Sequence, residues 1–140
     1  MLPFSNLTAV TPVDGRYADK CVALRAHFSE FALIKRRVIV EVKWLIHLAD
    51  ERVIEQLPPF DEPTRASLLA LIENFSVEQA ERVKAIERTT NHDVKAVEYF
   101  LKEHFASADP SLTSRLEFFH FACTSEVPHC KQLPASTDNA

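Results

Sequence analysis

The sequence predicts an all-α fold, and three observations support that prediction. The 140 residues include a single glycine, Gly15, whereas sandwiches and barrels need many glycine-rich turns. Apolar residues recur at three- and four-residue steps through long stretches of the chain. Hydroxyl and acidic residues precede these stretches at positions typical of helix N-caps. The 46% hydrophobic and 26% charged residues are typical of a globular domain rather than a disordered chain.

Residues 1–20 show no sustained hydrophobic period and are predicted to form an ordered N-terminal arm. The segment TPVDGRY, residues 11–17, has the Pro-x-Asp-Gly chemistry of a tight turn. The N-terminus lacks the basic start and continuous apolar stretch of a signal peptide, and no apolar run approaches the length of a membrane span. We therefore expect a soluble protein that has no membrane partner.

The first long helix is predicted over residues 28–50, where apolar side chains recur on one helical face. These side chains are Phe31, Ile34, Val38, Val42, Leu45 and Leu48. Residues 37–42, RVIVEV, are rich in β-branched side chains and would resemble a strand if they stood alone. The helical period on both sides favours a helix there.

Two further helices are predicted from their N-terminal signals. Asp61 is an expected N-cap for a helix over residues 62–74, which has proline in its first turn. Ser76 and Gln79 have the spacing of a capping box and are expected to start a helix that ends near residue 87.

The stretch ERTTNHDVKAVEYFLKE, residues 87–103, precedes and enters another helical period. Thr90 and Asp93 have the capping-box spacing, which predicts Thr90 as the N-cap. A helix N-terminus exposes unpaired N–H groups and the positive end of the helix dipole, so it attracts a phosphate or carboxylate. Asn91 and His92 would add side-chain donors. The open alternative is a simple cap made by Thr90 and Asp93, with His92 merely exposed.

Two other places offer candidate anion contacts. Arg16 and Tyr17 follow a tight turn, and a guanidinium on a fixed backbone suits phosphate binding. The apolar run LEFFHFA, residues 116–122, is expected to form one or two buried helical turns, and Thr124 and Ser125 follow it with two hydroxyl donors. The alternatives are a turn whose arginine pairs with a surface acid, and a helix cap.

The sequence predicts no metal site. His120, between two phenylalanines, is expected to be a core histidine with satisfied hydrogen bonds. Cys21, Cys123 and Cys130 have spacings that fit neither a disulfide framework nor a zinc site, and they favour a reducing cytoplasm. The net charge of -4, without a basic block, argues against a nucleic-acid partner.

Three segments occur in a characteristic order: SNLTAVTPVDGRY, then KAIERTTNHDVKAVEYFLKE, then FFHFACTSE. Together they closely resemble the bacterial adenylosuccinate lyases, a family of the fumarase/aspartase superfamily, over about residues 1–126. The resemblance implies an N-terminal helical lyase domain over residues 1–110 and the start of the central helical domain over residues 111–126. It leaves the central long-helix bundle truncated and residues 127–140 as a divergent, disordered tail.

The resemblance also implies an activity. Such lyases release fumarate by β-elimination, from adenylosuccinate to give AMP and from succinyl-aminoimidazole carboxamide ribotide, in purine biosynthesis. They are cytoplasmic homotetramers that bind a small nucleotide substrate and need no cofactor. The substrate-binding residues implied here are Arg16, Tyr17, Asn91, His92, Asp93, Thr124 and Ser125.

The chain departs from the family pattern after Glu126, where it reads Val127-Pro128-His129 instead of an Asp-Ile-Asn-Asn-like helix start. The resemblance places the general-acid histidine and general-base serine of the family beyond this chain, so no catalytic residue is assigned and the chain alone is expected to be inactive. The abrupt change of pattern is typical of a frameshift or misjoined gene model. The alternative function is a truncated interaction or nucleotide-binding protein that modulates full-length lyase subunits.

Overall fold

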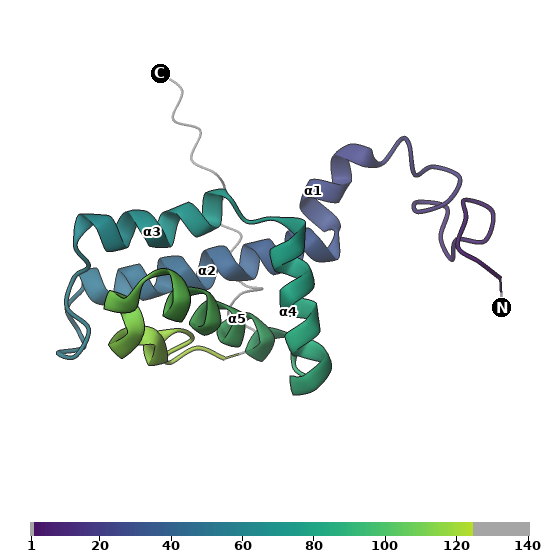
Figure 1. Ribbon diagram of the computed structural model, residues 1–140. Helices are drawn as coiled ribbons and strands as arrows, with labels where there is room; N and C mark the ends of the chain where they lie inside the picture. The colour runs from purple at the N-terminus through teal and green to yellow at the C-terminus, as the bar shows by residue number, and fades with distance from the viewer. Residues whose placement is uncertain (1, 125–140) are drawn as a thin grey trace, which may run out of the picture. The chain divides into compact units, whose positions relative to one another are not determined.

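The computed structural model describes residues 2–124, which form helices joined by turns and loops (Figure 1). In chain order the elements are η1 (Val22–Leu24), α1 (Arg25–Phe28), α2 (Glu30–Asp50), α3 (Glu62–Glu73), α4 (Val77–Thr90), α5 (Asp93–Ala108) and η2 (Pro110–Phe118), where η denotes a 3₁₀ helix. No strand occurs between residues 2 and 124, so the predicted all-α class is confirmed. The chain divides into two compact units, one up to Leu33 and one from Ile34 onward. The domain boundaries inferred from the resemblance stay predictions.

The first unit begins with the predicted tight turn. The Gly15 N–H donates to the Thr11 carbonyl at 3.1 Å, and the Tyr17 N–H donates to the Pro12 carbonyl at 2.8 Å. Gly15 is buried, and a Cβ atom on it would lie 2.6 Å from the carbonyl oxygen of Asn6. The only glycine of the chain is therefore needed for a close approach of two backbone segments.

We expect Gly15→Ala to loosen the arm, because the added methyl group collides with a backbone carbonyl that cannot move alone. Hydrogen exchange at the amides of Gly15 and Tyr17 should accelerate in the variant. Asp14→Ala, on the exposed neighbouring residue, is the matched control and should leave the exchange unchanged. Unaltered protection in Gly15→Ala would show that the arm has room for a side chain.

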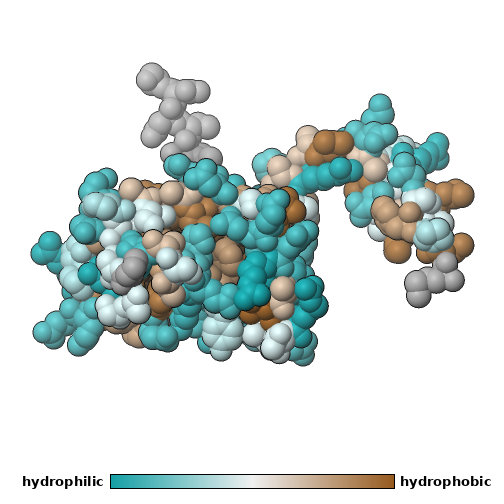
Figure 2. Space-filling view, viewed as in Figure 1, coloured by the Kyte–Doolittle hydropathy of each residue, from teal (hydrophilic) through white to brown (hydrophobic). Residues whose placement is uncertain are grey.

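The surface of the first unit carries several large apolar side chains, which Figure 2 shows in brown along the N-terminal arm. The most exposed are Leu2, Phe4, Leu7 and Val10 of the arm and Phe28 at the end of α1, all exposed by 79% or more. Exposed apolar side chains in such a group are typical of a surface that contacts another protein surface.

The second unit is built on α2, whose apolar face is buried as the helical period predicted. Ile34, Val38, Val42 and Leu45 are almost fully buried on that face. The β-branched stretch at residues 37–42 is helical, because burial of the continuous face outweighs its local strand preference.

The N-terminal signals of α3 and α4 act as predicted. The Asp61 carboxylate accepts from the Thr64 backbone N–H at 3.0 Å. The Ser76 hydroxyl accepts from the Gln79 N–H at 3.4 Å, and the Gln79 side chain accepts from the Ser76 N–H at 2.9 Å. The capping box is therefore confirmed. The predicted end of α4 near Glu87 is wrong by almost one turn, since no glycine or proline interrupts the helix before residue 90.

Helix α5 packs against α4 and η2. The rings of Phe105 and Phe119 stack at 5.8 Å between centroids, and both are fully buried. The expected helical turns lie earlier than predicted, because η2 covers residues 110–118 and the chain turns sharply after it. Asp109 explains the early start, since its carboxylate accepts from the Ser111 N–H at 3.0 Å and caps the 3₁₀ helix.

His104 on α5 makes the stability of this unit depend on pH. Its ring lies 5.9 Å from that of Phe100 and 5.0 Å from that of Phe105. Burial lowers the pKa of His104 below its ordinary value of 6.5. The unfolded chain therefore binds this proton more readily than the folded chain, and stability falls as the pH drops below the unfolded pKa.

We expect His104→Gln to remove part of that pH dependence. The free energy of unfolding in urea is measured at about pH 7.5 and about pH 5.5, two values that bracket the ordinary pKa of a histidine. The natural chain should lose more stability over this interval than the variant. An equal loss in both proteins would mean that His104 titrates alike in the folded and unfolded chains.

Candidate functional site

The turn between α4 and α5 holds three of the predicted site residues. Asn91 adopts a left-handed backbone conformation, with φ 50° and ψ 33°, and its N–H donates to the Glu87 carbonyl at 2.8 Å. His92 is extended and directly precedes α5. Asn91 tolerates the left-handed conformation better than most residues. The chain therefore passes from one helix into the next through two exposed polar residues.

His92, and not Thr90, is the N-cap of α5. The His92 Nδ1 atom accepts from the Lys95 N–H at 3.1 Å. The Thr90 hydroxyl instead donates to the His92 carbonyl at 3.2 Å, and Asp93 accepts from the Val94 N–H at 2.8 Å. The predicted capping box at Thr90 is wrong, because α4 continues through Thr90 and leaves the imidazole nearest the free N–H groups.

The cap also fixes which histidine nitrogen is available to a ligand. Because Nδ1 of His92 accepts a hydrogen bond, the proton of the neutral ring lies on Nε2, which is then a donor. The His92 side chain is 52% exposed. The cap is therefore made by His92 rather than by Thr90 and Asp93, and a ligand at this turn stays a prediction.

We expect His92→Ala to destabilise the second unit by about 1 kcal/mol, because it removes the acceptor at the N-terminus of α5. His92→Asn is the matched control, since asparagine is among the strongest N-cap residues and should retain most of the stability. Urea unfolding of the three proteins measures the difference. Equal unfolding midpoints for the alanine and asparagine variants would contradict the capping role.

Asp93 forms an ion pair with a buried arginine, Arg37. The Arg37 guanidinium lies 2.7 Å from Asp93 Oδ2, with side chains 4% and 47% exposed respectively. Burial is the largest single influence on the Asp93 carboxyl and opposes its ionisation. The Val94 N–H and the charge of Arg37 together outweigh that influence and hold the pKa of Asp93 below its ordinary value. The turn therefore offers exposed donors at Asn91 and His92 and one ionised acceptor at Asp93.

The segment after η2 leads to the second group of predicted site residues. His120 and Ala122 both have positive φ, 60° and 57°, so the chain turns sharply before Thr124. The Cys123 N–H donates to the His120 carbonyl at 3.1 Å. Thr124 is exposed, and Ser125 lies outside the described residues.

Side chains of α2 hold this segment in place. His120 Nδ1 lies 2.6 Å from Glu41 Oε1, and the Trp44 indole N–H donates to the Phe121 carbonyl at 2.9 Å. Glu41 is 2% exposed. Burial, followed by the negative charge of Glu41, raises the pKa of the Cys123 thiol. His120 therefore has the satisfied hydrogen bond that the sequence predicted, although it is half-buried in a turn.

Arg16 and Tyr17 lie in the first unit, and both are exposed. The guanidinium carbon of Arg16 is 5.3 Å from the centroid of the Tyr17 ring. This pair is therefore preassembled by a cation–π contact within the arm.

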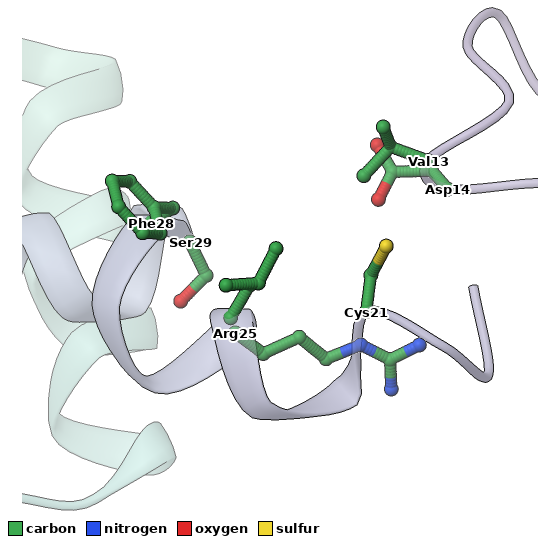
Figure 3. Close-up of a pocket in the computed structure, with 7 residues that line it drawn as sticks. Val13, Asp14, Cys21, Arg25, Phe28 and Ser29 are labelled. Carbon is green, nitrogen blue, oxygen red and sulfur yellow. The ribbon is translucent and has the colours of Figure 1, made fainter. Parts of the chain in front are cut away.

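The first unit also contains a pocket of 190 Å³ (Figure 3). Its lining residues are Val13, Asp14, Cys21, Leu24, Arg25, Phe28 and Ser29. Figure 3 shows Asp14 and Arg25 on opposite sides of it. The predicted residues Arg16 and Tyr17 are not among its lining, so the pocket is distinct from the predicted contacts.

Two residues that matter for the geometry were missed from the sequence, namely Arg37 and Glu41. A signal existed, because both interrupt the apolar period of residues 28–50 beside Val38 and Val42. Within residues 2–124, no group of three or more histidine, cysteine, aspartate and glutamate side chains could hold a metal ion. The helices of that same stretch are too short or too polar to cross a membrane.

Residues 2–124 form only helices, turns and loops, and a polar turn joins α4 to α5. The described residues are consistent with the all-α N-terminal region of the fumarase/aspartase superfamily. No family model matches the chain.

In amino-acid sequence, the chain is similar to bacterial adenylosuccinate lyases. The chain is 57% identical to adenylosuccinate lyase of Escherichia coli and 54% identical to that of Haemophilus influenzae, each time over 98% of this chain and 31% of the relative. It is 56% identical to the Vibrio cholerae enzyme over 89% of this chain and 27% of the relative. The resemblance noted in the sequence is therefore confirmed, and the chain is homologous to the N-terminal region of these enzymes.

The length of these alignments can be compared with the expected end of the family resemblance at residue 126. Alignments that cover 98% of the chain extend past Glu126, whereas the Vibrio cholerae alignment covers 125 residues. The similarity to two of these three relatives therefore reaches further than the expected 126 residues. The chain spans about a third of the length of each relative, since the covered share is 31% or less.

Proposed function

We propose that this chain supplies the N-terminal, substrate-binding segment of an adenylosuccinate lyase. The observation that carries the proposal is the 57% identity to the Escherichia coli enzyme over almost the whole chain. The turn at residues 91–93 supports it, because it offers exposed donors and an ionised acceptor in the segment that carries the resemblance.

The proposed reaction is a β-elimination that releases fumarate from adenylosuccinate to give AMP, or from succinyl-aminoimidazole carboxamide ribotide. A base removes the proton on the carbon next to a carboxylate, and that electron pair forms the double bond of fumarate. The carbon–nitrogen bond breaks, and an acid protonates the leaving nitrogen. Negative charge builds on the carboxylate during proton removal, so fixed donors around it lower the barrier.

Each site residue has a chemically suitable part in this proposal. Asn91 and the Nε2–H of His92 donate to acidic groups of the substrate, and ionised Asp93 accepts from a substrate N–H or hydroxyl group. Thr124 and Ser125 donate to the carboxylate on which charge builds. Arg16 binds a phosphate, with Tyr17 beside it. This segment is assigned no acid or base.

We further propose that the parent enzyme is a homotetramer in the cytoplasm. The exposed apolar residues of the arm support subunit contact, since a group of large apolar side chains favours burial against another protein surface. The cysteine pattern supports a reducing compartment.

A hybrid enzyme tests the proposed function. Residues 1–124 of this chain replace the matching segment of Escherichia coli adenylosuccinate lyase, and fumarate release from adenylosuccinate is measured. We expect kcat/KM within about tenfold of the parent enzyme, because the segments share most of their residues. A hybrid that folds and elutes with the parent on size exclusion but releases no fumarate would contradict the proposal.

His92→Asn in the hybrid separates binding from capping. Asparagine retains the N-cap of α5 but cannot present the imidazole Nε2–H in the same place. We expect the thermal midpoint to stay near that of the unsubstituted hybrid while kcat/KM falls by about tenfold or more. Full activity in this variant would remove His92 from the binding site.

A further inference from the structure

One face of α2 contacts both segments that hold the predicted site residues of the second unit. Arg37, Glu41 and Trp44 occupy positions i, i+4 and i+7, which lie on the same side of a helix. Arg37 reaches the first turn of α5, whereas Glu41 and Trp44 reach the segment before Thr124. A single helix therefore carries the supports of two separate loops.

The contact made by Arg37 fixes the start of α5. Its guanidinium lies 2.7 Å from Asp93, which is itself bonded to the Val94 N–H at 2.8 Å. A planar guanidinium is a directional donor, so it fixes the orientation of the carboxylate as well as its position. Asn91 and His92 directly precede the residue that is held in this way.

The contacts made by Glu41 and Trp44 fix the turn that leads to Thr124. The Glu41 carboxylate bonds the His120 ring at 2.6 Å, and the Trp44 indole bonds the next backbone carbonyl, that of Phe121, at 2.9 Å. The backbone of His120 has positive φ, which is a sterically uncommon conformation. The contacts with α2 hold the segment in that geometry.

Stabilisation of the fold alone does not explain why charged side chains are buried at these two positions. Arg37 and Glu41 are 3% and 2% exposed. A buried charge loses its hydration, and well-packed apolar residues in such places often stabilise a fold as much or more. Charged residues at both positions are therefore better explained by the geometry that they impose.

We propose that Arg37 and Glu41 are positioning residues of the substrate site, which set the spacing between the turn at residues 91–93 and Thr124. This inference rests on the proposed function for its catalytic consequence. Its structural content, that each α2 residue holds one loop, is independent of any activity.

Hydrogen exchange on the 140-residue chain tests the structural content. We expect Arg37→Met to accelerate exchange by about tenfold in residues 91–97 and to leave residues 119–124 unchanged, whereas Glu41→Met should do the reverse. Arg37→Lys and Glu41→Gln retain a donor or an acceptor and should restore most of the protection. Acceleration that is equal throughout the second unit would overturn the proposal in favour of a general structural role.

Kinetics in the hybrid enzyme test the catalytic consequence. Arg37→Met disturbs a loop assigned to nucleotide binding and should raise KM by about tenfold with little change in kcat. Glu41→Met disturbs the donors to the carboxylate on which charge builds and should lower kcat by about tenfold. Arg82→Met, which breaks the exposed ion pair with Glu103, is the control and should change neither constant.

The outcomes of the two experiments separate the two proposals. Local exchange effects with an inactive unsubstituted hybrid would overturn the proposed function and support the positioning of the loops. An active hybrid whose kinetic constants survive both methionine substitutions would overturn the positioning proposal and support the function. Recovery of KM in Arg37→Lys and of kcat in Glu41→Gln would support the positioning proposal further, because only the polar contact is restored.

Discussion

Replacing His120 by leucine is expected to destabilise the second unit by about 3 kcal/mol or more, because it removes the hydrogen-bond partner of a buried carboxylate. Glu41 is almost fully buried, and its Oε1 atom bonds the His120 ring at 2.6 Å. Among the described residues, Glu41 Oε2 has no hydrogen-bond partner. Loss of the imidazole would therefore leave the carboxylate with a large desolvation cost and little compensation.

Two further variants give this prediction its controls. His120→Asn retains an N–H donor and tolerates positive φ, so it should lose much less stability than His120→Leu. The double variant Glu41→Leu/His120→Leu removes both polar partners and should recover part of the loss. Urea unfolding at constant pH measures all of these proteins. If the double variant loses as much free energy of unfolding as the two single variants together, the loss in His120→Leu does not come from a buried carboxylate without a partner.

The second large effect is expected at the aromatic centre of the same unit. Phe105→Ala should lower the free energy of unfolding by about 3–5 kcal/mol, because it removes a fully buried ring and leaves a cavity. Phe105 is 0% exposed, and its ring stacks on that of Phe119 at 5.8 Å. The loss should also loosen the turn at His120, which follows Phe119 directly.

Phe121→Ala is the matched control for that effect. Phe121 is 45% exposed, so its truncation removes little buried area and should cost far less stability. Phe105→Leu should fall between the two, since leucine fills part of the cavity. Unfolding in urea ranks the three variants. If Phe105→Ala and Phe121→Ala unfold at the same urea concentration, the stacked pair is not the centre of the core.

Local signals explain why much of the fold could be predicted. The helical period of residues 28–50 and the caps at Asp61 and Ser76 depend on residues within a few positions of one another. Such signals placed the starts of α3 and α4 correctly. The first long helix begins two residues later than predicted, at Glu30, and the Ser29 hydroxyl before it accepts from the Ala32 N–H at 3.1 Å. The end of α4 and the start of η2 were misplaced, because the Thr90 hydroxyl donates to the His92 carbonyl instead of capping α5, and because the Asp109 carboxylate caps a 3₁₀ helix that the apolar run did not indicate.

The candidate site was predictable in part for the same reason. Asn91, His92 and Asp93 do lie at a helix N-terminus, as the sequence indicated. That His92 rather than Thr90 makes the cap depends on the length of the preceding helix, which local spacing left ambiguous. The supports from Arg37 and Glu41 join residues far apart in the chain, and no local pattern specifies such partners. The ligand roles of all these residues stay predictions.

The contact between Glu41 and His120 also sets an order in which the two halves of this site form during folding. The turn at Asn91 joins helices that follow each other directly, so it closes early and at small entropic cost. The His120 segment must find a partner 79 residues earlier in the chain, which requires the intervening helices to have packed first. The last part of the second unit to form should therefore be the segment that carries Thr124, and in the native state it should be among the first to open.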